Sequence, residues 1–335
     1  MSPRSSRQAR GRHRPRAVVA LGGNALLRRG EPLESESQAR AAREAAARLA
    51  SVAADQQLIV THGNGPQVGL LALMSEAYSD TGARYPLDVL GSETEGQIGY
   101  VLALALDNAL AEQEAVAVLT RVVVDADDPA FQSPSKFIGP VYSRADARAL
   151  ARRHGWTVKR DGEAWRRVVP SPEPRRIVGL GAIERLIDAG FVVICTGGGG
   201  IPVIETADGG QRGVEAVIDK DLASALLAID LGVETLVLAT DVSAVYDDYG
   251  TARQHAITRV SPAELRARRF AAGSMGPKVE AVCRFVERTG GRGVIGSLQE
   301  IDAMFRGQAG TQVLPDGSEL IFEHRKASHG YEHAA

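Results

Sequence analysis

The sequence predicts an α/β fold: a three-layer αβα sandwich around a central, mainly parallel sheet, with a small projecting subdomain. Apolar runs of strand length alternate with helix-length segments along most of the chain, which is typical of a parallel sheet covered by helices on both faces. Three of these apolar runs lead straight into glycine-rich turns. Residues 125–174 break the alternation, and they predict the projecting part.

Six short apolar runs predict the strands of the sheet. They are rich in Val, Ile and Leu, and runs that are apolar throughout are typical of strands buried on both faces. The expected strands span residues 18–21, 58–60, 115–124, 191–195, 235–239 and 293–295.

The helices are predicted from apolar side chains that recur every three or four residues. The first is expected to start at residues 35–38, which have the pattern of a capping box, and Ala42, Ala46 and Leu49 fall on one face. Pro277 is typical of a first helical position. The expected helices span residues 35–54, about 67 onward, 96–111, 176–189, 219–231 and 277–289.

Residues 125–174 are rich in proline, charged and aromatic side chains, among them Lys136, Trp156 and Trp165. Such a length without the strand–helix alternation is too long for a plain loop in a compact domain. We therefore expect a small lid subdomain over the sheet edge, within a single domain of residues 17–335.

The first 16 residues carry six arginines and no acidic residue. They lack the apolar run of a secretory signal and the apolar face of an organelle transit peptide. We expect a disordered basic tail over residues 1–16, with weak attraction to anionic surfaces as the alternative.

The composition limits the classes of function. A formal net charge of -2 argues against nucleic-acid binding as the main function, and no apolar run approaches the roughly 18 residues of a membrane span. The two cysteines give no disulfide framework, which indicates a reducing compartment, and we expect a cytoplasmic protein. Cys195 is expected to be an inert buried thiol in a strand.

Three glycine-rich turns predict an anion-binding site. They lie at residues 22–24, 61–66 and 197–200, each directly after a predicted strand. Glycines let a backbone approach a ligand closely with its N–H groups exposed, which suits phosphate or carboxylate. The chain has no P-loop motif, and residues 179–181 lack the third glycine of a Rossmann fingerprint. We interpret the turns as a site for phosphate chemistry; purely structural turns are the alternative.

Three lysines, Lys136, Lys220 and Lys278, lie beside apolar or glycine-rich residues rather than in charged surface stretches. Phosphoryl transfer needs positive charge on the transferring group and in-line positioning, with little covalent help from the protein. The lysines would supply that charge, and Asp219 would hold two of them apart and aimed. The alternative is that each lysine is solvated or caps a helix.

Other residues have two interpretations. Glu215 would either steer the lysines or cap a helix. His62 is interpreted as a hydrogen-bonding loop residue rather than a general base, because phosphoryl transfer to an anion removes no proton. Residues 240–246 follow a predicted strand, where an adenine or ribose would rest at the sheet edge; a simple turn is the alternative.

Several motifs resemble those of carbamate kinases, a branch of the amino-acid kinase superfamily. The resemblance runs in family order from about Val18 to Val313, and the strings HGNGPQVG and EAVIDKD are specific to this branch. The matching segments are residues 19–25, 62–69, 136–140, 167–172, 197–203 and 213–221.

This resemblance implies the αβα sandwich, usually as a homodimer. It implies reversible phosphoryl transfer between ATP and carbamate, which gives ADP and carbamoyl phosphate with magnesium. In the family the net flux often runs toward ATP, at the end of arginine or purine catabolism.

The resemblance also implies roles for individual residues. The glycine turns would hold the transferred phosphoryl group and carbamate, through Gly22, Gly23, Asn24, Gly63, Asn64, Gly65, Gly199 and Gly200. The nucleotide would lie against Thr240, Asp241, Val242, Tyr246, Ser274, Met275, Gly276 and Lys278. The catalytic residues would be Lys136, Asp219, Lys220 and Lys278. We assign no residue as a metal ligand.

Two positions depart from the family pattern. Glu95 replaces a usual Gln near an expected helix start, and Gly276 replaces a larger apolar residue. The alternative functions are a kinase for another small acid, such as acetylglutamate or glutamate, and a non-catalytic sensor of carbamoyl phosphate or nucleotide. Lys136 on the predicted lid favours the small carbamate, and the retained Asp219, Lys220 and Lys278 argue against a pure sensor.

Overall fold

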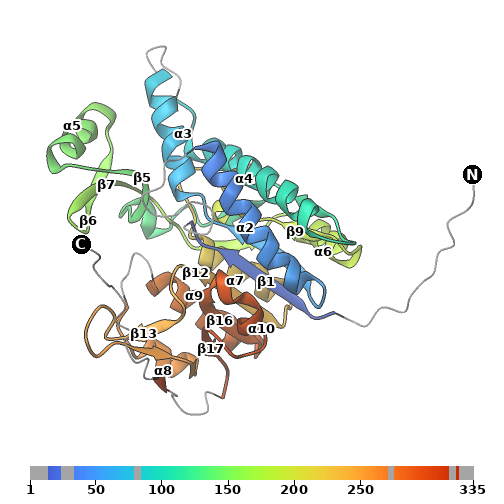
Figure 1. Cartoon of the computed structure of the whole chain (residues 1–335). Coiled ribbons are helices and arrows are strands. Elements are labelled where there is room, and N and C mark those ends of the chain that lie inside the picture. Colours follow the sequence, from blue (N-terminus) through green and yellow to red (C-terminus); the bar gives the residue numbers. More distant parts are fainter. Residues whose placement is uncertain (1–13, 24–33, 79–83, 271–274, 317–321, 324–335) are drawn as a thin grey trace, which may run out of the picture.

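An eight-stranded sheet runs through the middle of the molecule (Figure 1). The structure, a computed structural model, describes residues 14–23, 34–78, 84–270, 275–316 and 322–323. The strand order is β15-β17-β16-β12-β1-β2-β9-β3, and neighbours run parallel except for β16 and β17. The strands are β1 (Arg16–Leu21), β2 (Gln57–His62), β3 (Ala115–Ala117), β9 (Val192–Ile194), β12 (Thr235–Thr240), β15 (Arg259–Val260), β16 (Arg292–Ser297) and β17 (Thr311–Val313).

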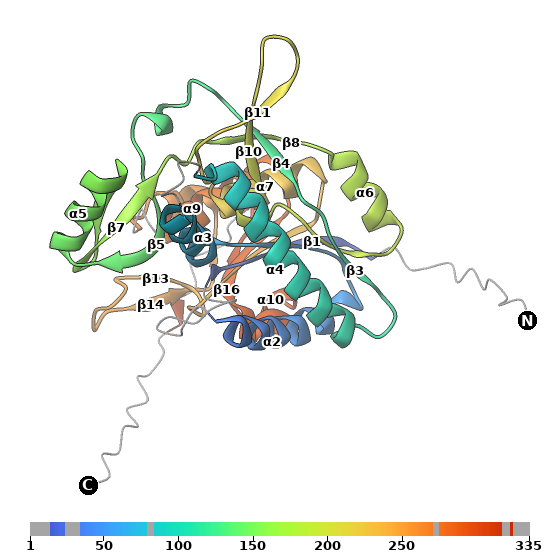
Figure 2. The same cartoon turned by 90° about the horizontal axis from the view of Figure 1, so that it is seen from above.

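Helices cover both faces of this sheet, which confirms the predicted αβα sandwich (Figure 2). Side chains of a strand alternate between the two faces. In β1, Val18 and Ala20 face one core and Val19 and Leu21 face the other. The first core is completed by α6 (Leu180–Asp188), α7 (Lys220–Asp230), α8 (Pro262–Arg266) and α9 (Met275–Thr289); the second by α2 (Ser35–Ala53), α4 (Leu87–Ala109) and α10 (Ile301–Phe305).

Two smaller sheets complete this part of the fold. One has the order β11-β10-β4-β8, with β4 (Arg121–Val124), β8 (Pro174–Ile177), β10 (Ile201–Glu205) and β11 (Gln211–Gly213). The other has the order β13-β14-β18, with β13 (Val245–Asp247), β14 (His255–Ile257) and β18 (Phe322–Glu323).

The sheet that contains β4 and β8 corrects two predictions. The strand expected over residues 115–124 is two strands, because β3 pairs with β9 in the central sheet and β4 pairs with β10 and β8. The helix expected from residue 176 begins only at Leu180. Its expected first turn is part of β8, and Gly179 precedes the helix in the left-handed conformation (φ +82°).

Two expected helix starts also differ. Glu34 is the N-cap of α2 and no side chain caps it, so the capping box is wrong. Helix α4 begins at Leu87, nine residues before the expected start, and its first backbone N–H donates to Glu215 Oε1 at 3.1 Å. Glu215 therefore caps a helix that is remote in sequence, and Glu95 lies in the buried interior of α4 rather than near its start.

Residues 136–169 form a separate small body that lies beyond α3 (Gly65–Tyr78) in Figure 1. It contains β5 (Lys136–Tyr142), α5 (Arg144–His154), β6 (Thr157–Asp161) and β7 (Ala164–Val169), with strand order β5-β7-β6. Before it, residues 129–131 form a short 3-10 turn. The lid function predicted for this segment stays a prediction.

The small body docks on α3 through a close contact between two glycines. A Cβ atom on Gly69 would lie 2.0 Å from Gly139 Cα, and Gly139 has φ +71°. Beside this contact, Glu76 of α3 lies 2.9 Å from His154 Nδ1 and accepts the Trp156 indole N–H at 3.3 Å. Backbone approach and polar contacts therefore fix the position of β5, which carries Lys136.

Strand β1 begins at Arg16, two residues before the expected start. The Arg16 backbone N–H donates to Glu234 at 2.6 Å, its guanidinium pairs with Asp188 at 2.6 Å, and Arg14 donates to the Ala53 carbonyl at 3.1 Å. Arg14 and Arg16 thus belong to the folded part, whereas residues 1–13 of the expected tail lie outside the described residues. None of the helices within the described ranges is long and apolar enough to cross a bilayer.

Replacing Gly69 by alanine is expected to destabilise the protein by about 1–3 kcal/mol, because the new methyl group meets the backbone of Gly139 rather than a movable side chain. The matched control is Gly91→Ala on α4, where an added Cβ meets nothing within 4 Å and the change should stabilise by roughly 0.5–1 kcal/mol. Urea unfolding of both variants measures the difference. Equal stability of the two variants would show that the glycine contact is not needed.

Candidate active site

A buried carboxylate holds two lysines at the start of α7. Asp221, 4% exposed, accepts from Lys220 Nζ at 2.5 Å and from Lys278 Nζ at 3.1 Å. Lys220 is the first residue of α7, and Lys278 lies in the first turn of α9. The two helices that pack side by side on one face of the sheet therefore bring both lysines to one point.

Asp219 performs a different task from the one predicted. Its Oδ1 caps α7 by accepting the N–H groups of Asp221 (2.9 Å) and Leu222 (3.4 Å). Its Oδ2 accepts from Lys136 Nζ at 2.5 Å, which ties the small body to the start of α7. From sequence, two lysines were assigned to Asp219, and the role of Asp221 was missed. The signal was present, since a carboxylate flanks Lys220 on each side.

The charges of this cluster change the pKa values of its members. Burial raises the pKa of Asp221, but Lys220 and Lys278 outweigh it and hold that pKa well below its usual range. Burial lowers the pKa of Lys220. Burial also lowers the pKa of Lys278, but the charges of Asp221, Asp219 and Asp241 reverse this effect and raise it above its usual value. One carboxylate between two cations leaves net positive charge, which suits an anionic ligand.

The first two glycine turns lie beside this cluster. Gly22 donates its N–H to the Ala239 carbonyl at 3.1 Å, and Gly63 donates to the Leu21 carbonyl at 3.0 Å, so β1, β2 and β12 end together. A Cβ on Gly63 would lie 3.4 Å from both Gly23 N and Lys220 Cδ. Asn24, the third residue of the first turn, lies outside the described residues.

The third turn is shaped by positive φ angles at Thr196 (50°), Gly198 (67°), Gly199 (94°) and Gly200 (85°). Each of its glycines packs against a different buried group. A Cβ would lie 2.3 Å from His62 Nε2 at Gly197, 2.2 Å from the Asn64 amide at Gly198, 2.6 Å from the Ile218 carbonyl at Gly199 and 2.3 Å from Val122 at Gly200. The four glycines therefore allow a close fit that side chains would block.

The polar residues of the second turn point inward. Asn64, 5% exposed, donates its amide to Thr94 Oγ1 at 2.9 Å, and Gly65 starts α3. His62 is fully buried and donates Nδ1–H to the Gly63 carbonyl at 3.1 Å, and no described residue forms a hydrogen bond with its Nε2. Burial lowers the pKa of His62 to about 4, so the imidazole is neutral at pH 7.

The residues predicted to contact a nucleotide follow β12 and begin α9. Thr240 donates to Asp241 at 3.1 Å, and the hydroxyl groups of Tyr246 and Ser243 lie 2.8 Å apart. Val242 lies in the same turn, and Met275 and Gly276 start α9 just before Lys278, whose pKa the charge of Asp241 helps to raise. Ser274 lies outside the described residues.

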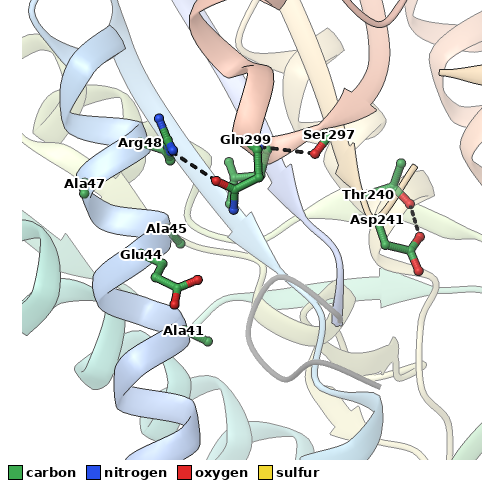
Figure 3. A pocket seen from close by; sticks show the side chains of 10 residues that line it. Ala41, Glu44, Ala45, Ala47, Arg48, Thr240, Asp241, Ser297 and Gln299 are labelled. Carbon is green, nitrogen blue, oxygen red and sulfur yellow. Dashed lines mark hydrogen bonds between the residues drawn. The ribbon is translucent and has the colours of Figure 1, made fainter. Parts of the chain in front are cut away.

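A cavity of about 630 Å³ opens on the other side of Thr240 and Asp241 (Figure 3). It lies between α2 and the ends of β12 and β16, and its charged lining residues are Glu44, Arg48 and Asp241. Lys278 is not among the described residues that line it, and α9 packs on the opposite face of the sheet from α2. Asp241, after the end of β12, lines the cavity and also acts by its charge on Lys278.

The chain is similar to known proteins in sequence and in fold. The amino acid kinase family matches residues 15–297. The chain is 53% identical over 311 residues to a carbamate kinase of Rhizobium meliloti (92% of this chain, 95% of the relative), and 49% identical over 299 residues to one of Haemophilus influenzae (89% and 96%). A solved carbamate kinase from Giardia lamblia bound to AMP-PNP is 37% identical with a TM-score of 0.81, over 90% of this chain and 99% of that chain.

Proposed function

We infer the function from the family: the chain belongs to the amino acid kinase family, and within it to the carbamate kinases. The protein is a phosphotransferase that moves a phosphoryl group between ATP and carbamate, and the products are ADP and carbamoyl phosphate. The single observation in the structure that supports this best is the Lys220–Asp221–Lys278 cluster beside three glycine turns.

The lysine cluster acts by charge. In the loose transition state of phosphoryl transfer, negative charge spreads over the equatorial oxygens of the transferring group. Lys220 is buried and Lys278 is partly buried, and both neutralise that charge where electrostatic interactions are stronger than in water. Asp221 keeps both cations in place before substrate arrives, so little reorganisation is needed during the reaction.

The substrate lies between the glycine turns and the small body. The turns at Gly22, Gly63 and Gly199 receive the phosphoryl and carbamate oxygens, because glycines without side chains let the ligand come close to the backbone. Lys136 reaches the same point from β5, where Asp219 holds it in the absence of substrate. Carbamate is already an anion, so no general base is required, and the neutral His62 packs beneath the turn instead.

The nucleotide lies at the end of β12 and the start of α9. Its phosphates face Lys278, and its base and ribose lie toward Thr240–Tyr246; the AMP-PNP complex of the Giardia relative supports nucleotide binding. Magnesium would be held by the phosphates of the nucleotide and would neutralise part of their charge. This fits the chain, because both buried carboxylates of the site, Asp219 and Asp221, already pair with lysines.

We further propose a cytoplasmic homodimer that makes ATP from carbamoyl phosphate in arginine or purine catabolism. For the dimer, exposed apolar side chains on and beside α4 support a contact surface: Tyr100 is 65% exposed, Leu104 50% and Leu119 59%. The cytoplasmic location rests on two cysteines that are both buried and unpaired. The direction and the pathway rest on the family resemblance.

Lys220→Ala and Lys278→Ala are each expected to reduce turnover by at least ~100-fold, the usual size of the loss of one transition-state charge contact. The assay couples ATP formation from ADP and carbamoyl phosphate to a colour reaction. Lys159→Ala, on the exposed surface of β6, is the matched control and should retain full activity. A folded Lys220→Ala variant with near-normal turnover would contradict the assigned chemistry.

Lys136→Ala is expected to lower turnover and affinity for carbamoyl phosphate, while ADP binding without that substrate barely changes. The reason is position: Lys136 contacts Asp219, whereas the nucleotide lies at β12 and α9. Calorimetry of ADP binding and the KM for carbamoyl phosphate separate the two effects. An equal loss of ADP affinity would show that Lys136 faces the nucleotide instead.

A further inference from the structure

A buried acid lies directly behind the third glycine turn. Glu95, in the interior of α4, is 3% exposed. Its Oε1 accepts the N–H of Gly197 at 2.8 Å, and its Oε2 accepts the N–H of Thr120 at 3.2 Å. Within the described part of the chain, no lysine or arginine forms an ion pair with it. A buried carboxylate with no cation is costly, so the site needs an explanation.

The groups that pack around Glu95 are neutral at pH 7. His62, the last residue of β2, packs against Gly197 as Glu95 does. A Cβ atom added to Gly197 would lie 2.3 Å from His62 Nε2 and 2.8 Å from Glu95 Cγ. After β9, Cys195 is fully buried, and burial raises its thiol pKa to about 12. Burial likewise raises the pKa of Glu95 to about 8 and lowers that of His62 to about 4.

Lys220 is the charged group that acts on this cluster from the ligand side through His62. Its stem lies against Gly63, its charge acts on His62, and the adjoining Ile218 carbonyl packs on Gly199. The turn Thr196–Gly200 therefore has the positive charge of Lys220 on the side where the phosphoryl group is proposed to lie. On its other side lie the uncharged side chains that surround Glu95. A negative charge on Glu95 would act on the anionic ligand, because buried surroundings with a low dielectric constant screen a charge only weakly.

We propose that Glu95 is a positioning residue for the anionic substrate: in its neutral, protonated form it holds Gly197 and the turn Thr196–Gly200 in the shape that binds phosphate, and its ionisation weakens binding of carbamoyl phosphate. Both oxygens accept a backbone N–H, Oε1 from Gly197 and Oε2 from Thr120, so the carboxyl group joins the glycine turn to the residue before β4. This inference rests on the proposed function, because the anion is taken to bind in front of the turn.

The test is the pH dependence of KM and kcat in the unmodified protein and in Glu95→Gln. In the unmodified protein, KM for carbamoyl phosphate should rise roughly tenfold or more as pH passes about 8, whereas kcat changes much less. The amide introduced by Glu95→Gln keeps an oxygen for Gly197 and cannot ionise, so this variant should not show the rise. Glu93→Gln, an exposed acid one half-turn away on α4, should leave it in place.

The pH profiles of the unmodified protein and of Glu95→Gln show whether Glu95 is the group that titrates. The same rise in both proteins would overturn the proposal and assign the titration to Lys220, whose pKa burial also lowers. A change in kcat alone, with a flat KM, would overturn it too. If the unmodified protein makes no ATP from carbamoyl phosphate at any pH, the proposed function fails instead, and binding of carbamoyl phosphate across the same pH range still tests Glu95.

Infrared spectroscopy of the unmodified protein tests the proposal even if the Glu95→Gln variant does not fold. Protein labelled with ¹³C-glutamate should show one buried carboxylic-acid band in its infrared spectrum near pH 7, and this band should disappear as pH passes about 8. Bound carbamoyl phosphate should shift its disappearance to higher pH, since the anion opposes ionisation. Absence of the band near pH 7 would overturn the proposal.

Discussion

The pairing of Asp221 with the buried Lys220 and the partly buried Lys278 is the interaction on which the site depends. Each ion taken out of water costs several kcal/mol, and a single buried charge without a partner destabilises a fold strongly. Asp221 satisfies Lys220 and Lys278 together, and it can do so only because α7 and α9 start at the same edge of the central sheet. The αβα layering thus places two cations at one point while leaving excess positive charge for an anion.

Close backbone packing is the second constraint, and it operates around the same cluster. The third turn fits against His62, Asn64, Ile218 and Val122 only because none of its four glycines has a side chain. The contact of Gly69 with Gly139 similarly lets β5 approach α3 and bring Lys136 to Asp219. Charge supplies the attraction for the ligand, and glycine packing supplies the geometry in which that charge is presented.

The central part of the fold could be predicted from sequence because its signals are local. Apolar runs and helical periodicity located β1, β2, β12, α7 and α9 to within a few residues. The start of α4 could not be found, since its cap is Glu215, which lies 128 residues away. The role of Asp221 was missed because a sequence shows two carboxylates beside Lys220 but not which one the helix cap uses. The first miss is a long-range contact, and the second is a local choice between two neighbouring carboxylates.

A double-mutant cycle between Asp221→Asn and Lys278→Ala is the sharpest test of whether Asp221 holds the lysines in position for catalysis. Turnover is measured for the unmodified protein, both single variants and the double variant, each checked for folding by circular dichroism. If Asp221 acts through Lys278, the double variant should lose little more than either single variant, a strongly non-additive result. Losses that multiply, or a folded Asp221→Asn variant with normal turnover, would contradict the account.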